Sequence, residues 1–189
     1  MLIFTVFASD SNYSDDELDN LIRKVADGDM KSLESLYYLT KTKVFSFAYS
    51  ILKDRSDAED ITHDVYLSIY KSAKLYKENN SPMGWIITIT KNLSYRKLNS
   101  NKKTTDIQDN ILTYPDNTEL SDDKLVLLEC INKLSSEESQ IIVLHVVSGF
   151  KHDEIGKILS LPAATVRSKY SRALKKLREE LSKGGAFNE

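Results

Sequence analysis

Residues 152–178 read HDEIGKILSLPAATVRSKYSRALKKLR, and this stretch decides how the carboxyl-terminal part of the chain is interpreted. Its apolar spacing predicts a short helix over HDEIGKIL, a break at SLP and a longer basic helix from Ala163 onward. A short helix, a tight turn and a longer cationic helix are typical of a helix-turn-helix. We therefore expect this motif here, with Pro162 in its turn.

The longer helix is predicted to have distinct inner and outer faces. The apolar side chains recur at helical spacing and form the inner face: Val166, Tyr170, Ala173, Leu174 and Leu177. The outward residues near the helix start are then Thr165, Arg167, Ser168, Lys169, Ser171 and Arg172. In a helix-turn-helix this part enters the major groove, where arginine reads guanine edges. A merely solvated helix would also carry cations, but their concentration after a short helix and a proline-containing turn favours DNA binding.

The segment before the motif also predicts helices. Ser135 and Glu138 have the spacing of a capping box ahead of the apolar run QIIVLHVV, which ends at Gly149. Upstream, LVLLECINKL is strongly apolar, and its Cys130 is interpreted as a small buried side chain. We expect a helical domain over residues 122–182, followed by a tail over residues 183–189.

The charge of the chain is distributed in blocks. The net charge is only −2, so no basic excess by itself indicates nucleic acid. Residues 91–103 nevertheless hold five cations and no acid, residues 106–123 hold six acids and no base, and residues 163–183 hold seven cations against two acids. The acidic block contains a proline and turn-forming residues without an apolar period. It predicts a flexible linker over residues 104–121, between a first domain at residues 20–103 and the second domain, with residues 1–19 as an amino-terminal tail.

The composition bounds the fold class and excludes several kinds of site. With 6 Gly and 3 Pro in 189 residues, the chain has few of the turns that a sandwich or barrel needs. We expect an all-α protein with two small helical domains. A single cysteine excludes an internal disulfide, and no cysteine or histidine spacing predicts a metal or cofactor site. No apolar run approaches the length of about 20 residues that a membrane-spanning helix needs. These features favour a reducing, cytoplasmic setting without membrane insertion.

Residues 57–73 predict an amphipathic helix in the first domain. Its buried stripe is expected to contain Ala58, Ile61, Val65 and Ile69, flanked by Tyr66 and Tyr70. The opposite face carries Asp60, His63, Asp64 and Lys71, with Leu67 in their midst. A leucine ringed by polar groups is a candidate partner contact, although a single exposed leucine is ordinary. His63 with its neighbouring acids is interpreted as a solvated face, because both other histidines lie in the second domain.

A second helix is expected from Pro82, with Ser81 as its amino-terminal cap. Its buried residues are predicted to be Trp85, Ile86, Ile89, Leu93 and Leu98. The complementary face carries Lys91, Asn92, Tyr95, Arg96 and Asn99, and the preceding loop carries Tyr76, Lys77, Asn79 and Asn80. Cations interleaved with flat and amide side chains suit a nucleic-acid strand, and such a loop is placed to hold an extruded base.

At this point the sequence resembles the bacterial RNA polymerase sigma factors, in particular the small extracytoplasmic-function group with domains two and four only. The segment DAEDITHDVYLSIYK is similar to the polymerase-binding helix of the family, and PMGWIITITKN is similar to its promoter-reading helix. The segment from Leu134 to Arg178 is similar to domain four almost throughout.

The resemblance implies a role for each candidate face. The clamp of the largest subunit of core RNA polymerase would bind Asp60, His63, Asp64 and Leu67. The minus-ten promoter element would be melted and read by Tyr76, Lys77, Asn79, Asn80, Lys91, Asn92, Tyr95 and Arg96. The minus-thirty-five element would be read by Thr165, Arg167, Ser168, Lys169 and Arg172. The resemblance also implies an anti-sigma factor as a partner.

Two other classes of function stay open at this stage. A stand-alone helix-turn-helix regulator, with a first domain that senses a ligand or dimerises, would bind a symmetric duplex site without polymerase. A hydrolase using Asp57, Glu59 and Asp60 lacks a phosphate loop, a nucleophile elbow or a metal-ligand set. We therefore expect an alternative sigma factor that acts by binding, without catalysis.

Overall fold

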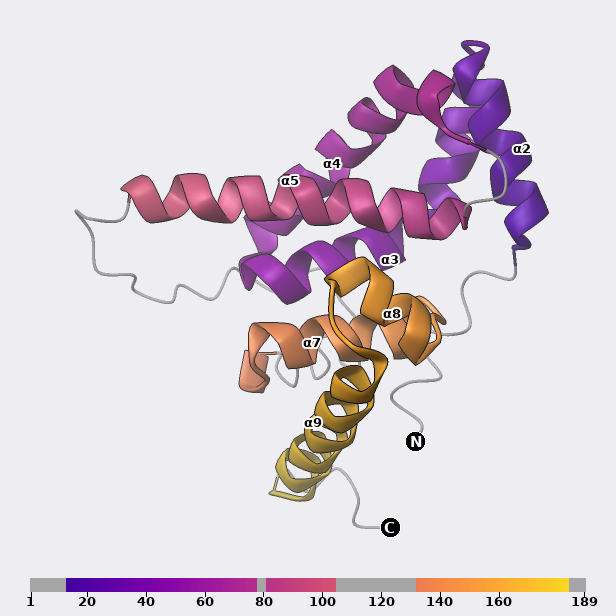
Figure 1. Ribbon diagram of the computed structural model, residues 1–189. Helices are drawn as coiled ribbons and strands as arrows, with labels where there is room; N and C mark the ends of the chain where they lie inside the picture. The colour runs from indigo at the N-terminus through magenta and orange to yellow at the C-terminus, as the bar shows by residue number, and fades with distance from the viewer. Residues whose placement is uncertain (1–12, 78–80, 105–131, 184–189) are drawn as a thin grey trace.

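The computed structural model describes residues 13–77, 81–104 and 132–183, and every regular element within these ranges is helical. The first domain contains α2 (Asp15–Ala26), α3 (Met30–Leu52), α4 (Arg55–Ser72), the short 3-10 turn η1 (Ala73–Leu75) and α5 (Pro82–Thr104). The second contains α7 (Ser136–Ile142), its π-helical continuation η3 (Val143–Val147), α8 (His152–Leu159) and α9 (Ala163–Lys183). The prediction of an all-α fold with two helical domains is confirmed (Figure 1).

Helix starts follow the capping signals in the sequence. The Ser81 hydroxyl accepts a hydrogen bond from the Gly84 N–H at 3.1 Å, with Pro82 as the first residue of α5. At α7 the capping box is complete, because the Ser135 hydroxyl accepts from the Glu138 N–H and the Glu138 carboxylate accepts from the Ser135 N–H. These contacts satisfy donors that a helix start otherwise leaves unpaired, which is why both boundaries lie where the sequence predicts them.

The amino-terminal boundary differs from the prediction. The expected tail over residues 1–19 overlaps α2, which begins at Asp15 after its cap Ser14, and Leu18 is fully buried. The acidic residues at positions 15–17 occupy the first turn of α2, where they complement the positive end of the helix dipole. Residues 15–19 of the expected tail therefore belong to a core helix. At the other boundary α5 extends through Thr104, while residues 105–131, with the rest of the expected linker and Cys130, lie outside the described residues.

Helix α3 is the central element of the molecule. It packs against α2, α4 and α5 within the first domain, and against α7 and η3 of the second. Buried residues along α3, among them Val44, Phe47 and Ile51, therefore contribute to one apolar cluster that extends through both domains. Helix α9 packs on α7 and α8, and Figure 1 shows it projecting away from the first domain. The sequence predicted two tethered domains but not that they would share a core.

The predicted stripe of α4 is confirmed except at one position. The inward residues Ala58, Ile61, Val65, Tyr66 and Ile69 are all buried. Tyr70 was expected on the flank of this stripe, but it is 47% exposed because it lies one turn beyond Tyr66 at the edge of the packed surface. On the opposite face Leu67 is 57% exposed, in agreement with the prediction.

Candidate nucleic-acid interface

The helix-turn-helix predicted from residues 152–178 is present in the structure. Helix α8 ends at Leu159, Ser160 adopts a left-handed conformation with φ 58°, and α9 begins at Ala163. The Leu161 N–H donates to the Gly156 carbonyl at 2.8 Å, so the turn lies directly against α8. Val166 is fully buried, while Ala173 and Leu177 pack with Leu134 and Ile142, and these contacts fix the inner face of α9 as predicted.

The outer face of α9 begins with the five residues assigned to a DNA site. Thr165 is half-buried, Ser168 and Arg172 are exposed, and the Arg172 guanidinium lies 3.4 Å from the Ser168 hydroxyl. Arg167 pairs with Asp153 at 3.2 Å, and Lys169 pairs with Glu137 of α7 at 2.6 Å. The Arg167 pair joins two exposed groups and the Lys169 pair joins a half-buried lysine to an exposed carboxylate, and ion pairs at the surface contribute little stability. A phosphate or a base edge could therefore replace these partners without disturbing the fold.

Three aromatic rings, from His145, His152 and Tyr170, join η3, α8 and α9. His145 stacks on His152 with ring centroids 4.6 Å apart, and Tyr170 lies within 5.0 Å of both. The His145 Nδ1 atom is 2.8 Å from the Phe150 carbonyl, whereas the buried Nε2 of His152 has no hydrogen-bond partner. Burial, with smaller contributions from His145 and Arg167, lowers the pKa of His152 below its usual value.

This lowered pKa predicts that the second domain loses stability in mild acid. The unfolded chain binds a proton at His152 near pH 6.5, whereas the folded chain does so only at lower pH. The contribution of neutral His152 to the free energy of unfolding is therefore fully present above pH 6.5, and it is lost as the pH decreases toward the lowered pKa of the folded chain. His152→Phe keeps the ring contact and removes the proton, so its urea midpoint should fall less between pH 7.5 and pH 5. An equal fall in both proteins would contradict this assignment.

The second cationic surface lies on α5. Asn92 and Arg96 are exposed, as predicted. Lys91 and Tyr95 are instead engaged by the second domain: the Lys91 ammonium donates to the Ile158 carbonyl at 2.5 Å, and the Gln140 amide donates to the Tyr95 hydroxyl at 3.1 Å. The structure thus places two of these four residues at the contact between the domains.

The loop before α5 is described only at its beginning. Lys77 is exposed, while Asn79 and Asn80 lie outside the described residues. Tyr76 is half-buried, its hydroxyl donates to the Asp19 carboxylate, and its ring lies 5.0 Å from that of Trp85. These contacts tie the start of the loop to α2 and α5. Tyr76 itself is therefore held between α2 and α5, and its contact with a base stays a prediction.

The polar face of α4 is exposed at Asp60, His63 and Asp64, around Leu67. Sequence reasoning missed its aromatic neighbour on α3. Tyr38 is 61% exposed, its ring meets Tyr37 edge-on, and Tyr37 in turn stacks on His63 with centroids 6.4 Å apart. The adjacent tyrosines at positions 37 and 38 were the available signal, since neighbours on a helix point about 100° apart and such a pair can place one ring inward and the other outward. The resulting surface combines apolar anchors with carboxylates.

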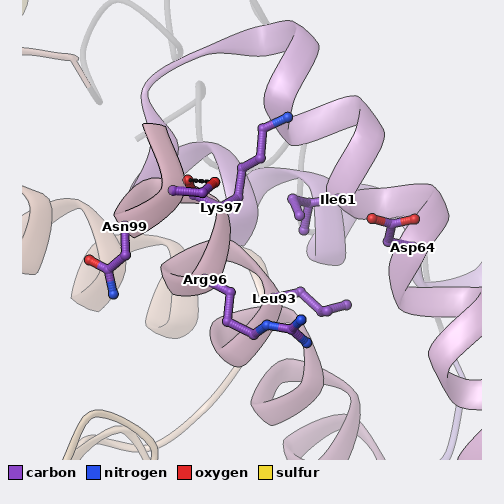
Figure 2. Close-up of a pocket in the computed structure, with 7 residues that line it drawn as sticks. Ile61, Asp64, Leu93, Arg96, Lys97 and Asn99 are labelled. Carbon is purple, nitrogen blue, oxygen red and sulfur yellow. Dashed lines mark hydrogen bonds between the residues drawn. The ribbon is translucent and has the colours of Figure 1, made fainter. Parts of the chain in front are cut away.

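An open groove separates this α4 face from the cationic face of α5 (Figure 2). It is lined by Ile61, Asp64, Leu93, Arg96, Lys97, Asn99 and Ser100. Lys97, one of these lining residues, pairs with Asp57 at 2.9 Å and with Asp60 at 3.9 Å. The Asp57 hydrogen bond and charge raise the pKa of Lys97, so the lysine stays a cation. The groove thus brings the Asp64 carboxylate of α4 and the Arg96 guanidinium of α5 to a common opening.

The described residues contain no group of three or more histidine, cysteine, aspartate or glutamate side chains that could hold a metal ion. In these same ranges, no helix combines the length and the apolar character that crossing a membrane requires.

Comparison with known proteins gives consistent matches along the chain. The family models for Sigma-70 region 2 and Sigma-70 region 4 match residues 36–104 and 124–177. The ECF RNA polymerase sigma factor SigK of Mycobacterium sp. strain KMS is 24% identical over 172 residues, which cover 86% of this chain and 89% of that protein. The SigK protein of Mycobacterium ulcerans is 24% identical over 175 residues, covering 86% and 92% of the two chains.

Two solved structures share the fold. The sigma factor RpoE in complex with the anti-sigma factor NepR from Bartonella quintana superposes with a TM-score of 0.66 at 22% identity, covering 81% of this chain and 98% of RpoE. CnrH in complex with the cytosolic domain of CnrY gives 0.63 at 18% identity, with 88% and 97% covered. From the two family models and the similarity over most of its length, the chain belongs to the sigma-70 family, as an extracytoplasmic-function sigma factor with regions two and four.

Proposed function

We propose that this protein is an alternative sigma factor that binds core RNA polymerase and directs promoter-specific transcription initiation. One observation carries the proposal: a helix-turn-helix presents Arg167 and Arg172 outward at the start of α9, in a chain with a second cationic face on α5. Similarity to curated extracytoplasmic-function sigma factors over 86% of the chain supports the same function.

The minus-thirty-five element is assigned to the start of α9. Arg167 and Arg172 carry guanidinium groups whose paired donors match the acceptors of a guanine edge in the major groove. Thr165, Ser168 and Lys169 are assigned to phosphates and neighbouring bases, which fix the position of the helix on the duplex. Arg167 and Lys169 pair with the surface carboxylates of Asp153 and Glu137. When DNA phosphates or base edges replace these carboxylates, both cations still have a partner.

The minus-ten element is assigned to α5 and the loop before it. Lys91 and Arg96 would neutralise phosphates of the non-template strand, while Asn92, Tyr95 and the loop residues Lys77, Asn79 and Asn80 would meet unpaired bases. Binding to extruded bases stabilises the open promoter relative to the duplex, so the free energy of binding itself drives strand separation. The protein then needs no catalytic group, cofactor or metal of its own.

Core polymerase is assigned to the exposed face of α4, at Asp60, His63, Asp64 and Leu67. An exposed apolar anchor ringed by charged groups fits the centre and rim of a protein interface. An anti-sigma protein is a second expected partner, since RpoE, which shares this fold, was solved with one. With these partners we expect a cytoplasmic protein that is nucleoid-associated when bound to polymerase, or is held at the membrane by an anti-sigma partner.

Run-off transcription with bacterial core polymerase on genomic fragments tests the function directly. A product that appears only when this protein is added supports the proposal and identifies the promoter. Failure to associate with core polymerase would refute it. A stand-alone regulator would instead give tight, sequence-selective duplex binding in the absence of polymerase.

Replacing Leu67 with glutamate should weaken association with core polymerase by about tenfold or more, because a central apolar anchor becomes a charge. Leu67 is 57% exposed, so the fold should be unaffected. The matched control is Met30→Glu, which alters a residue of similar exposure, 58%, at the start of α3. Fluorescence titration with core polymerase measures both affinities, and an equal loss for the two variants would contradict the assignment of the α4 face.

A further inference from the structure

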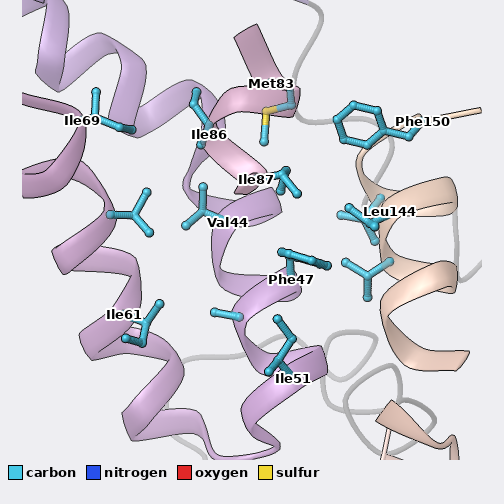
Figure 3. Packing of buried hydrophobic residues seen from close by; sticks show 14 of the residues in the cluster. Val44, Phe47, Ile51, Ile61, Ile69, Met83, Ile86, Ile87, Leu144 and Phe150 are labelled. Atoms are coloured by element: carbon cyan, nitrogen blue, oxygen red, sulfur yellow. The ribbon is translucent and has the colours of Figure 1, made fainter. Parts of the chain in front are cut away.

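The π-helical segment η3 holds His145 in a fixed position. The π-helix is a rare form that occurs mostly as single turns, often at functional sites. His145 lies at the centre of this segment, and its Nδ1 atom is 2.8 Å from the Phe150 carbonyl oxygen. Because a carbonyl oxygen only accepts, Nδ1 carries a proton. The Phe150 ring is buried in the apolar cluster, where Figure 3 shows it among the other buried side chains, so this acceptor is anchored.

His152 faces this ring from the first turn of α8. The two imidazoles stack with centroids 4.6 Å apart and an interplanar angle of 23°. The Nε2 atom of His152 is buried, and it has no hydrogen-bond partner among the described residues. We assign Nε2 as the unprotonated nitrogen of a neutral ring. Adding a proton there would create a buried cationic N–H group without an acceptor, which costs free energy.

The surroundings of His152 also oppose a positive charge. His152 is the first residue of α8, where the helix dipole concentrates partial positive charge. The imidazole of His145 acts on it from η3, and the guanidinium of Arg167 acts on it from α9. Burial and these two neighbours all lower the pKa of His152. The neutral ring is therefore the form that fits this arrangement.

The acidic groups nearby are already engaged. The Asp153 carboxylate, which favours the charged imidazole, pairs with Arg167 at 3.2 Å. The Glu154 carboxylate accepts a hydrogen bond from the Lys151 N–H at 2.7 Å. Helix α5 also packs on α8, and its Lys91 binds a carbonyl near the opposite end of that helix. A proton on His152 would therefore have to compete with Arg167 for Asp153.

Tyr170 connects the two histidines to the helix assigned to DNA. Its ring meets that of His145 edge-on, with centroids 4.7 Å apart, and lies 5.0 Å from that of His152. Tyr170 follows Arg167 by three residues and precedes Arg172 by two, so it lies in the stretch of α9 that carries both arginines. Because the three rings belong to η3, α8 and α9, their contacts help to fix the rotation of α9 relative to α8. Separating the rings would change the direction of both guanidinium groups.

We propose that His145, His152 and Tyr170 form a pH-sensitive latch: with His152 neutral, the rings hold α9 in the orientation that reads duplex DNA, and protonation of His152 releases it. This inference rests on the proposed function, which assigns the start of α9 to the minus-thirty-five element. A protonated His152 is hydrated only when it leaves the stack, so the proton binds the released form better and shifts the population toward it. Promoter recognition therefore decreases in mild acid.

A single proton sets the size of the effect. In the released form His152 titrates near its ordinary pKa of about 6.5, whereas in the latched form it binds a proton only at lower pH. The proton can therefore shift the equilibrium toward the released form by at most about tenfold at pH 5.5 and about fourfold at pH 6.0. At pH 7.5 the ring is neutral in both forms, so the latch is closed.

Hydrogen exchange in the full chain tests the latch without DNA. Protection factors, corrected for the intrinsic dependence of exchange on pH, are compared at pH 7.5 and pH 5.5. We expect the amides of α8 and of the start of α9 to lose protection by about fivefold, while those of α7 change by less than about twofold. His152→Phe keeps a ring and removes the proton, so its protection should not change, and His152→Gln is a second variant that does not titrate.

The matched control is Lys157→Ala, an exposed change on the same helix, which should lose protection in acid as the unsubstituted chain does. Circular dichroism verifies that each protein retains its helices at both pH values. The same loss of protection in the two His152 variants would overturn the latch. A loss that is as large in α7 would also overturn it, because it would show general unfolding of the domain.

Binding of promoter DNA tests the consequence for recognition. The probe is the promoter fragment obtained by run-off transcription, bound by the complex of core polymerase with this protein at pH 7.5 and pH 6.0. The affinity of the unsubstituted complex should decrease about threefold more than that of the His152→Phe complex, a comparison that cancels the pH dependence of the polymerase itself. Parallel decreases in the two complexes would overturn the proposal. Failure of the proposed function gives a different result: no promoter fragment is bound at either pH, while hydrogen exchange still depends on His152.

Discussion

Reversing Arg167 and Arg172 together to glutamate should reduce promoter-dependent run-off transcription by at least about 100-fold, while association with core polymerase persists. Each arginine that pairs with a base edge contributes about 1–3 kcal/mol of discrimination, so losing two removes about 2–6 kcal/mol. The introduced carboxylates also repel phosphate. Neither change should unfold the domain, because Arg167 holds only an exposed ion pair and Arg172 only contacts Ser168.

The control must change the net charge of the protein by the same amount without altering the outer face at the start of α9. Lys157→Glu with Lys175→Glu reverses two exposed cations in the same helix-turn-helix, so it alters the net charge by the same amount. Transcription should fall much less in this control, since long-range repulsion is screened over about 10 Å at 0.1 M salt. An equal loss of transcription in the two double variants would show that the effect comes from total charge. Unchanged transcription after the reversal of Arg167 and Arg172 would contradict the assignment of α9 to the minus-thirty-five element.

Local patterns in the sequence predicted most of the helices and their faces. The inner face of α9, from Val166 to Leu177, and the stripe of α4 are set by apolar residues at a spacing of three and four. The caps Ser81 and Ser135 mark helix starts because their hydroxyl groups bond to backbone three residues away. Such signals involve neighbours in the sequence, and for that reason the sequence suffices to locate them.

Contacts between distant segments could not be inferred in the same way. Ile87 is buried and Lys91 is engaged because α7, η3 and α8 pack on α3 and α5, and no periodicity within α5 encodes that partner. Tyr76 was expected to meet a base, yet its hydroxyl bonds to Asp19, fifty-seven residues earlier. In each case the side chain is chemically suited to two partners, and only the tertiary structure selects one.

Gly156→Ala should destabilise the second domain by about 1–3 kcal/mol, the usual cost of overpacking. Within a helix this substitution is ordinarily stabilising by about 1 kcal/mol, because alanine has the higher helix propensity. Here a Cβ atom would lie 2.7 Å from the Leu161 carbonyl oxygen and 3.6 Å from the Ala163 N atom. These atoms belong to the backbone of the turn, so they cannot move aside without shifting the start of α9. The steric effect should therefore exceed the gain in propensity.

Urea unfolding followed by circular dichroism measures this loss, with Lys157→Ala at the next, exposed position as the control. That control should leave the midpoint nearly unchanged, since surface substitutions usually fall within about 0.5 kcal/mol. The same Gly156→Ala protein should also lose promoter-dependent transcription under conditions where it remains folded, because a shifted α9 no longer presents Arg167 at the angle that α8 imposes. A midpoint raised by Gly156→Ala would show that helix propensity prevails, and that α8 and the turn are not as closely packed as the 2.7 Å contact requires.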